Sequence, residues 1–152
     1  MEANKTVSAT VVPAVNLDGV QSPSSSILIL VPISQESTSN NAKMWITTRC
    51  RDRKTNIPEI KTFFALDRAI NALTKGSFSL VIISLSPSDD GRNRDVLTFL
   101  KEHSTGYSNT HFIVFGNERT LDGSTNTSNV TFSLSDHFGK TLGSVWNKLA
   151  LT

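Results

Sequence analysis

Residues 78–91 read FSLVIISLSPSDDG, and this stretch decides the fold of the chain. An apolar run rich in β-branched residues closes into a loop of Pro, Ser, Asp and Gly. Such a run is typical of a strand that is buried on both faces of a parallel sheet. Comparable runs occur at 27–31 and 112–115, so the sequence predicts several central strands of this kind.

Strand-like and helical patterns alternate along the rest of the chain. Apolar residues at helical spacing predict helices at 42–50, 66–75, 96–103 and 138–150, with Asp136 as a cap for the last one. Further strands are predicted at 57–64 and 130–134, and a loop at 34–41. This alternation predicts a three-layer α/β/α domain with a five-stranded parallel sheet in the order 2-1-3-4-5.

The segment after the fourth strand interrupts the alternation. Residues 117–128 read NERTLDGSTNTS and contain no apolar period that could form a helix face. We therefore expect the helix between the fourth and fifth strands to be missing. One flank of the fifth strand would then be partly uncovered and open to another chain.

Composition excludes several classes of protein. With 152 residues, 38% of them hydrophobic, and a net charge of +2, the chain suits one domain without a nucleic-acid or membrane partner. The single cysteine, Cys50, fits a reducing compartment, so we expect a cytoplasmic protein. Residues 1–25 are predicted to be a disordered tail, with a short added strand as the alternative, and residues 26–152 to form the domain.

In pattern and spacing, residues 60–102 resemble the second strand through the third helix of bacterial response-regulator receivers. The element order from residue 27 to about 150 is also similar, which implies a flavodoxin-like, receiver-like fold. In working receivers, an aspartate at the end of the third strand accepts a phosphoryl group. An acidic pair after the first strand helps to hold Mg²⁺, and a hydroxyl after the fourth strand and a lysine after the fifth contact the phosphoryl group.

The chain departs from the receiver pattern at each of these positions. Ser84 stands at the phosphoacceptor position, and a serine without a base is a poor nucleophile. Ser34 follows the first strand, Gly116 or Asn117 holds the hydroxyl position, and Asp136 falls at the lysine. The resemblance therefore implies a pseudo-receiver that needs no metal or cofactor and acts as a protein-interaction or regulatory module in signalling.

The predicted interaction surface is the flank made by residues 116–129 and the helix at 138–150. Its partner would be another protein, an adjacent signalling domain or a second copy of the chain. Trp146 lies beside the apolar stripe of its helix, so core packing is the alternative for this residue. The candidate partner-binding residues are Glu118, Arg119, Leu121, Phe138 and Trp146.

Other functions remain open from the sequence. A small hydrolase-like enzyme could use Ser84 if His111 or His137 lay beside it as a base. A scaffold or assembly subunit without a signalling role is a further alternative. The run 89–91, Asp-Asp-Gly, is interpreted as a turn rather than a cation site, and the three histidines lack the spacing of metal ligands.

Overall fold

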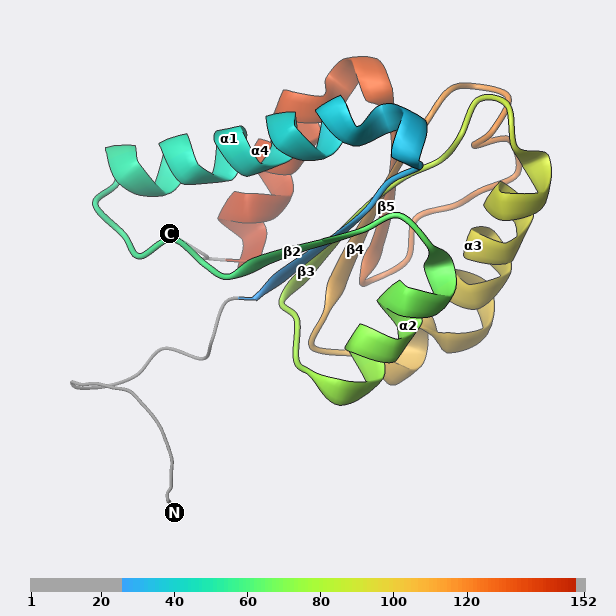
Figure 1. Cartoon of the computed structure of the whole chain (residues 1–152), viewed down its shortest axis with the longest axis horizontal. Coiled ribbons are helices and arrows are strands. Elements are labelled where there is room, and N and C mark those ends of the chain that lie inside the picture. The colour runs from blue at the N-terminus through green and yellow to red at the C-terminus, as the bar shows by residue number, and fades with distance from the viewer. Residues whose placement is uncertain (1–25, 150–152) are drawn as a thin grey trace.

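The computed structural model describes residues 26–149, which form a five-stranded parallel sheet flanked by helices (Figure 1). The strand order is β2-β1-β3-β4-β5, as predicted. The expected disordered tail, residues 1–25, lies outside the described residues. The strands are β1 (Ile27–Leu30), β2 (Ile60–Phe63), β3 (Leu80–Ser84), β4 (His111–Gly116) and β5 (Val130–Leu134).

Four α-helices cover the sheet: α1 (Glu36–Asp52), α2 (Leu66–Lys75), α3 (Asp90–His103) and α4 (Phe138–Leu149). α1 and α4 lie on one face, and α2 and α3 on the other (Figure 1). Successive side chains of each strand point to opposite faces, so β1 and β3 supply apolar residues to both cores. This arrangement confirms the predicted three-layer architecture and explains why the central strands are apolar throughout.

The helix α1 begins earlier than predicted. The expected loop at 34–41 is wrong, because a 3-10 turn at Ile33–Gln35 leads directly into α1 at Glu36. Ser39 continues the buried stripe of Ala42, Ile46 and Cys50, and its hydroxyl donates to the Glu36 carbonyl at 2.7 Å. Packing on the sheet and this local hydrogen bond therefore outweigh the low helix propensity of the Ser/Asn-rich stretch.

The helix α3 also begins earlier than predicted, and the expected turn at 89–91 is wrong. Asp89 is the N-cap of α3, and its carboxylate accepts a hydrogen bond from the backbone N–H of Arg92 at 3.0 Å. Asp90 and Gly91 then form the first turn of the helix. An aspartate before a helix satisfies one of its free N–H groups, which is why the Asp-Asp-Gly run starts a helix here.

The connection from β4 to β5 contains no helix in residues 117–129, all of which are described, as predicted. After β5, a 3-10 turn at Ser135–His137 leads into α4. The predicted capping role of Asp136 is wrong, because Asp136 lies inside that turn, whose cap is the backbone position of Leu134. Between residues 26 and 149, none of the helices combines the length and apolar character needed to cross a membrane.

Candidate functional site

The carboxyl ends of the parallel strands bring Ser84 next to the turn that follows β1. Ser84 is the last residue of β3, and only 4% of its surface is exposed. Its hydroxyl donates to the Gln35 side-chain oxygen at 2.6 Å. Gln35 reaches this position because the 3-10 turn at Ile33–Gln35 follows β1, and β1 pairs in parallel with β3. The Ser84 hydroxyl is therefore buried and already satisfied by a neutral partner.

A cation, Arg92, approaches Ser84 from the first turn of α3. Its Nη1 lies 3.4 Å from the Ser84 carbonyl oxygen, and its Nη2 is buried without a hydrogen-bond partner among the described residues. Burial lowers the pKa of Arg92, and the nearby Asp89 carboxylate partly opposes this shift. The sequence analysis did not identify Arg92 or Gln35 as neighbours of Ser84. Gln35 lies directly before α1 and Arg92 lies in the first turn of α3, and both helices begin earlier than the sequence predicts.

The other positions compared with the receiver pocket do not form a charged cluster. Ser34 and Asp136 are exposed. The Asn117 side-chain oxygen accepts from the Thr120 backbone N–H at 2.8 Å, and the Asn117 N–H donates to the Thr120 hydroxyl at 2.9 Å. Gly116 is buried under this turn. Within residues 26–149, no group of three or more His, Cys, Asp or Glu side chains is placed to hold a metal ion.

His111 lies at the opposite end of the sheet from Ser84, because it begins β4 and pairs with Leu80 at the start of β3. Its Nε2 is 2.8 Å from the Thr131 hydroxyl of β5. Burial lowers the pKa of His111, and the positive charge of Lys148 lowers it further. In the described part of the chain, no histidine is within hydrogen-bond distance of Ser84, so Ser84 has no base beside it.

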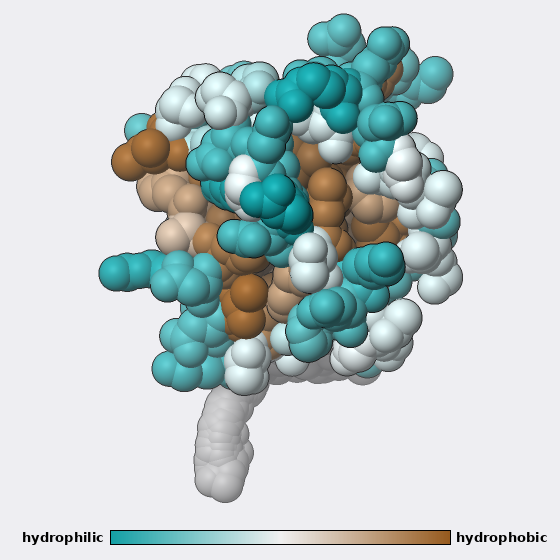
Figure 2. All heavy atoms as spheres, turned by 90° about the vertical axis from the view of Figure 1, so that its right-hand side faces the viewer, coloured by the Kyte–Doolittle hydropathy of each residue, from teal (hydrophilic) through white to brown (hydrophobic). Residues whose placement is uncertain are grey.

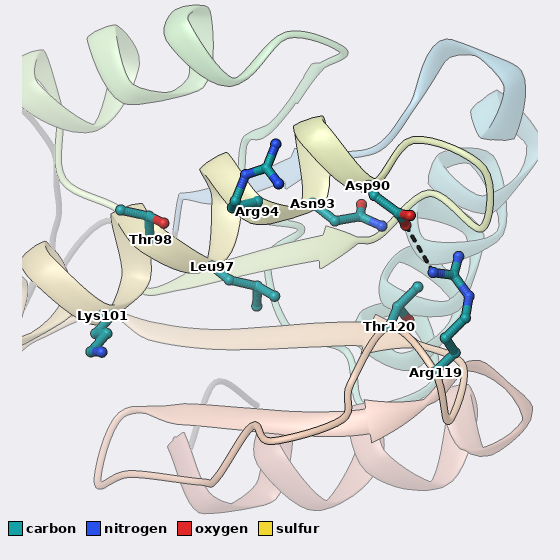
Figure 3. Close-up of a pocket in the computed structure, with 8 residues that line it drawn as sticks. All are labelled: Asp90, Asn93, Arg94, Leu97, Thr98, Lys101, Arg119 and Thr120. Atoms are coloured by element: carbon teal, nitrogen blue, oxygen red, sulfur yellow. Dashed lines mark hydrogen bonds and ion pairs between the residues drawn. The ribbon is translucent and has the colours of Figure 1, made fainter.

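A groove runs along α3, between this helix and the β4–β5 connection. It consists of two adjoining hollows of about 320 and 460 Å³, which share Leu97 and Lys101 as lining residues. Figure 3 shows the first hollow, with residues of α3 on one side and Arg119 and Thr120 of the connection on the other. The second hollow continues to the end of α3 and is lined by Leu100, Val130 and Phe132 among others. We call the two hollows together the α3 groove.

An ion pair bridges one end of the α3 groove. Arg119 Nη1 lies 2.9 Å from an Asp90 carboxylate oxygen, as the dashed line in Figure 3 marks, and its Nη2 donates to the Pro87 carbonyl at 2.8 Å. Both charged side chains are mostly exposed, so the pair contributes about 0–1 kcal/mol to stability. Its structural effect is to hold the connection beside the N-terminus of α3.

The five candidate partner-binding residues do not share one surface. Glu118 and Arg119 are exposed, and Leu121 packs against the core beneath α2 and α3. Phe138 lies on the opposite face of the sheet and contacts the Phe115 ring at a centroid distance of 4.8 Å. The hypothesis of an interface anchor at Trp146 is wrong, because this side chain is 0% exposed and packs edge-on against Trp45.

Two arrangements therefore stand out: a neutral, hydrogen-bonded Ser84 at the mouth of the sheet, and an open groove beside α3. Comparisons with protein-family models and with curated proteins found no match to this chain.

Proposed function

We propose that this chain is a receiver-like domain that acts in signalling by binding another protein and that does so without accepting a phosphoryl group. The observation that carries the proposal is the state of Ser84, which is 4% exposed and donates its hydroxyl to Gln35 at 2.6 Å. A nucleophile must be accessible to its phosphodonor and activated by a base or a charge. Ser84 meets neither condition.

The electrostatics of the sheet mouth support the same proposal. Phosphoryl transfer to a carboxylate depends on Mg²⁺, which takes oxygen ligands that usually include carboxylates. Here a charged group beside the Ser84 backbone is the guanidinium of Arg92, with Nη1 at 3.4 Å from the carbonyl oxygen. A fixed positive charge at this point repels a divalent cation. The exposed Asp136, at the place of a receiver's lysine, would also repel rather than attract a phosphoryl group.

A phosphodonor assay tests the proposal directly. The full chain is incubated with Mg²⁺ and acetyl phosphate, and its intact mass is measured beside that of a working receiver domain. We expect the receiver to gain the mass of one phosphoryl group and this chain to gain none. A stoichiometric mass gain of this chain would overturn the proposal, and the Ser84→Ala variant would show whether Ser84 or another residue is the acceptor.

A second measurement addresses the metal. Titration of the ¹⁵N-labelled chain with Mg²⁺ should leave the amide resonances of residues 31–36, 84–92 and 116–120 unchanged at millimolar concentrations. Saturable shifts confined to these three segments would contradict the proposal, because they surround the mouth of the sheet. Shifts spread over exposed carboxylates would be the ordinary response of a protein surface to a divalent salt and would leave the proposal standing.

A further inference from the structure

The α3 groove lies where the fold ordinarily requires a helix. Parallel strands such as β4 and β5 are usually joined by a helix that packs on the sheet and covers its apolar side chains. In this chain, residues 117–129 make the connection without one. The groove opens on the same face as α3, and two β5 residues that belong to the core on that face, Val130 and Phe132, line it.

The floor of the groove is apolar and can receive a helix. Its apolar lining residues come from two elements: Leu97 and Leu100 from α3, and Val130 and Phe132 from β5. Leu97 and Phe132 are half-buried and present surface to the groove, whereas Leu100 and Val130 are buried at its base. Figure 2 faces this side of the molecule and shows hydrophobic atoms exposed between hydrophilic side chains. An amphipathic helix places residues i, i+3, i+4 and i+7 on such a floor. A helix bound in this way would cover the part of the sheet beside β5 that α2 and α3 leave open.

The length of the groove fits a short helix. The lining residues extend along α3 from Asp90 to the turn at Ser104 and Thr105. A helix rises about 1.5 Å per residue, so this distance corresponds to about 14 residues, or roughly 21 Å. An occupant of that size presents about four turns, which is sufficient for four or five apolar contacts.

The charges on the rim define the occupant more closely. The α3 side carries Arg94 and Lys101, and neither forms an ion pair within residues 26–149. In Figure 3 the dashed line joins Asp90 and Arg119 and does not involve Arg94 or Lys101. The opposite rim carries one acid, Asp122, which forms no ion pair with any residue that the structure describes. Carboxylates on the flank of an occupant next to α3 would complement Arg94 and Lys101.

We infer that the α3 groove docks an amphipathic helix of another protein, with an apolar stripe on Leu97 and Phe132 and acidic residues facing Arg94 and Lys101. This inference rests on the proposed function, in which the domain acts by binding a protein. It adds the place of binding, the secondary structure of the partner segment and its charge. Because Arg94 and Lys101 are exposed cations, the groove should prefer an acidic helix over a basic one, which a purely apolar contact would not do.

Two synthetic peptides of about 14 residues serve as probes. Each has leucine at i, i+3, i+4 and i+7 positions, and one flank carries glutamate in the acidic peptide and lysine in the basic peptide. Fluorescence anisotropy gives the affinity for the full chain, and amide shifts of the ¹⁵N-labelled chain give the location. We expect the acidic peptide to bind more tightly, with shifts at residues 97–105 and 130–132, and the preference to weaken at high salt.

Charge reversal provides the matched test. Lys101→Glu should weaken binding of the acidic peptide about tenfold and strengthen binding of the basic peptide, which a loss of structure would not do. Lys140→Glu makes the same change in net charge on an exposed residue of α4, on the other face of the sheet, and should leave both affinities unchanged. Equal affinities for the two peptides, or amide shifts over α1 and α4, would overturn the inference.

Two other occupants are outcomes of the same experiment. A tenfold gain in acidic-peptide affinity on deletion of residues 1–25 would show that the chain's own N-terminal segment covers the groove, against the inference. Self-association that Lys101→Glu abolishes would assign the groove to a second copy, also against it. A chain that takes up no phosphoryl group and binds neither peptide would retain the proposed function and lose only this inference.

Discussion

At the scale of single residues, Asn93 fixes the loop that leads from β3 to α3. Its side chain is 5% exposed, accepts a hydrogen bond from the Ser86 N–H at 2.8 Å and donates to the Ser86 carbonyl at 2.6 Å. Asn93→Ala would leave two buried backbone groups unpaired, so we expect the free energy of unfolding to fall by about 2–4 kcal/mol. Urea denaturation followed by circular dichroism measures this loss.

The control for Asn93→Ala is Thr98→Ala, an exposed position five residues further along the same helix. Its effect on the free energy of unfolding should stay within about 0.5 kcal/mol. An equally small effect at Asn93 would show that water replaces its side chain at Ser86. It would refute the argument that the buried Asn93 side chain holds the loop.

His111 gives the molecule a pH dependence whose sign follows from its surroundings. Burial and the charge of Lys148 lower its pKa, so the unfolded chain binds the proton more readily than the folded one. Its contribution to stability is therefore complete above the ordinary pKa of 6.5 and is lost as the pH falls from 6.5 through the lower folded value. The free energy of unfolding should fall there by up to about 1.4 kcal/mol per pH unit.

Urea denaturation of the wild type and of His111→Gln at several pH values between about 7.5 and 5 tests this dependence. The variant should lose the part of the pH slope that His111 causes, whereas His103→Gln, at an exposed position, should retain the wild-type slope. If His111→Gln keeps the full slope, another group is responsible and the argument from burial fails.

At the scale of elements, the turn after β4 depends on the absence of a side chain at Gly116. A Cβ added at Gly116 would overlap the Thr120 hydroxyl and lie 3.2 Å from Leu121 Cγ. Gly116→Ala should therefore cost about 1–3 kcal/mol of stability. Thr120→Ala alone should cost about 1 kcal/mol, because the Asn117 N–H loses its partner at 2.9 Å.

A double-mutant cycle separates the overlap from other effects. Once the Thr120 hydroxyl is gone, the added methyl group of Gly116→Ala has more room, so the double variant should lose less stability than the two single variants together, by about 0.5–1.5 kcal/mol. If the losses of stability of the two single variants simply add in the double variant, as measured by chemical denaturation, the cost of Gly116→Ala does not come from the overlap with Thr120. It would then come from another contact, for example the one with Leu121.

The element order and the strand order could be predicted from the sequence because the central strands are short, apolar on both faces and separated by clear helical stripes. The starts of α1 and α3 could not. Ser39 and Asp89 have side chains that favour loops in isolation, and here the same side chains hydrogen-bond to the backbone of a helix start. At α1 this choice also depends on packing against the sheet, which a local pattern does not contain, whereas at α3 the same aspartate is compatible with a turn or with a helix cap.

The candidate sites were predictable only in part for the same reason. The position of Ser84 follows from the end of its strand, but its contact with Gln35 joins residues 49 positions apart. Trp146 lies beside the apolar stripe of α4, and its burial comes from a second helix, α1, which brings Trp45 to a centroid distance of 5.7 Å. The α3 groove could not be predicted from the sequence, because it depends on how the β4–β5 connection and α3 are arranged in three dimensions.

At the scale of the whole molecule, the two faces of the sheet are covered unequally. α1 and α4 enclose one core, which includes Trp146, Ile46 and Leu142 without exposed surface. On the other face, α2 and α3 leave the groove beside β5, and Leu97 and Phe132 are only half-buried there. Stability should therefore depend more on the first face, whereas the second face retains surface for binding.

Truncations on the two faces test this asymmetry. Trp146→Ala should lower the free energy of unfolding by about 3–5 kcal/mol, and Leu97→Ala by about half as much or less. Trp146→Phe should be much milder, because it keeps most of the ring volume and removes a buried indole N–H that has no partner within residues 26–149. Urea denaturation gives the three values. If Leu97→Ala destabilised the domain as much as Trp146→Ala, the face beside α3 would contribute as much to the free energy of unfolding as the enclosed face. A surface on which folding depends so strongly would not be free to accept a partner helix.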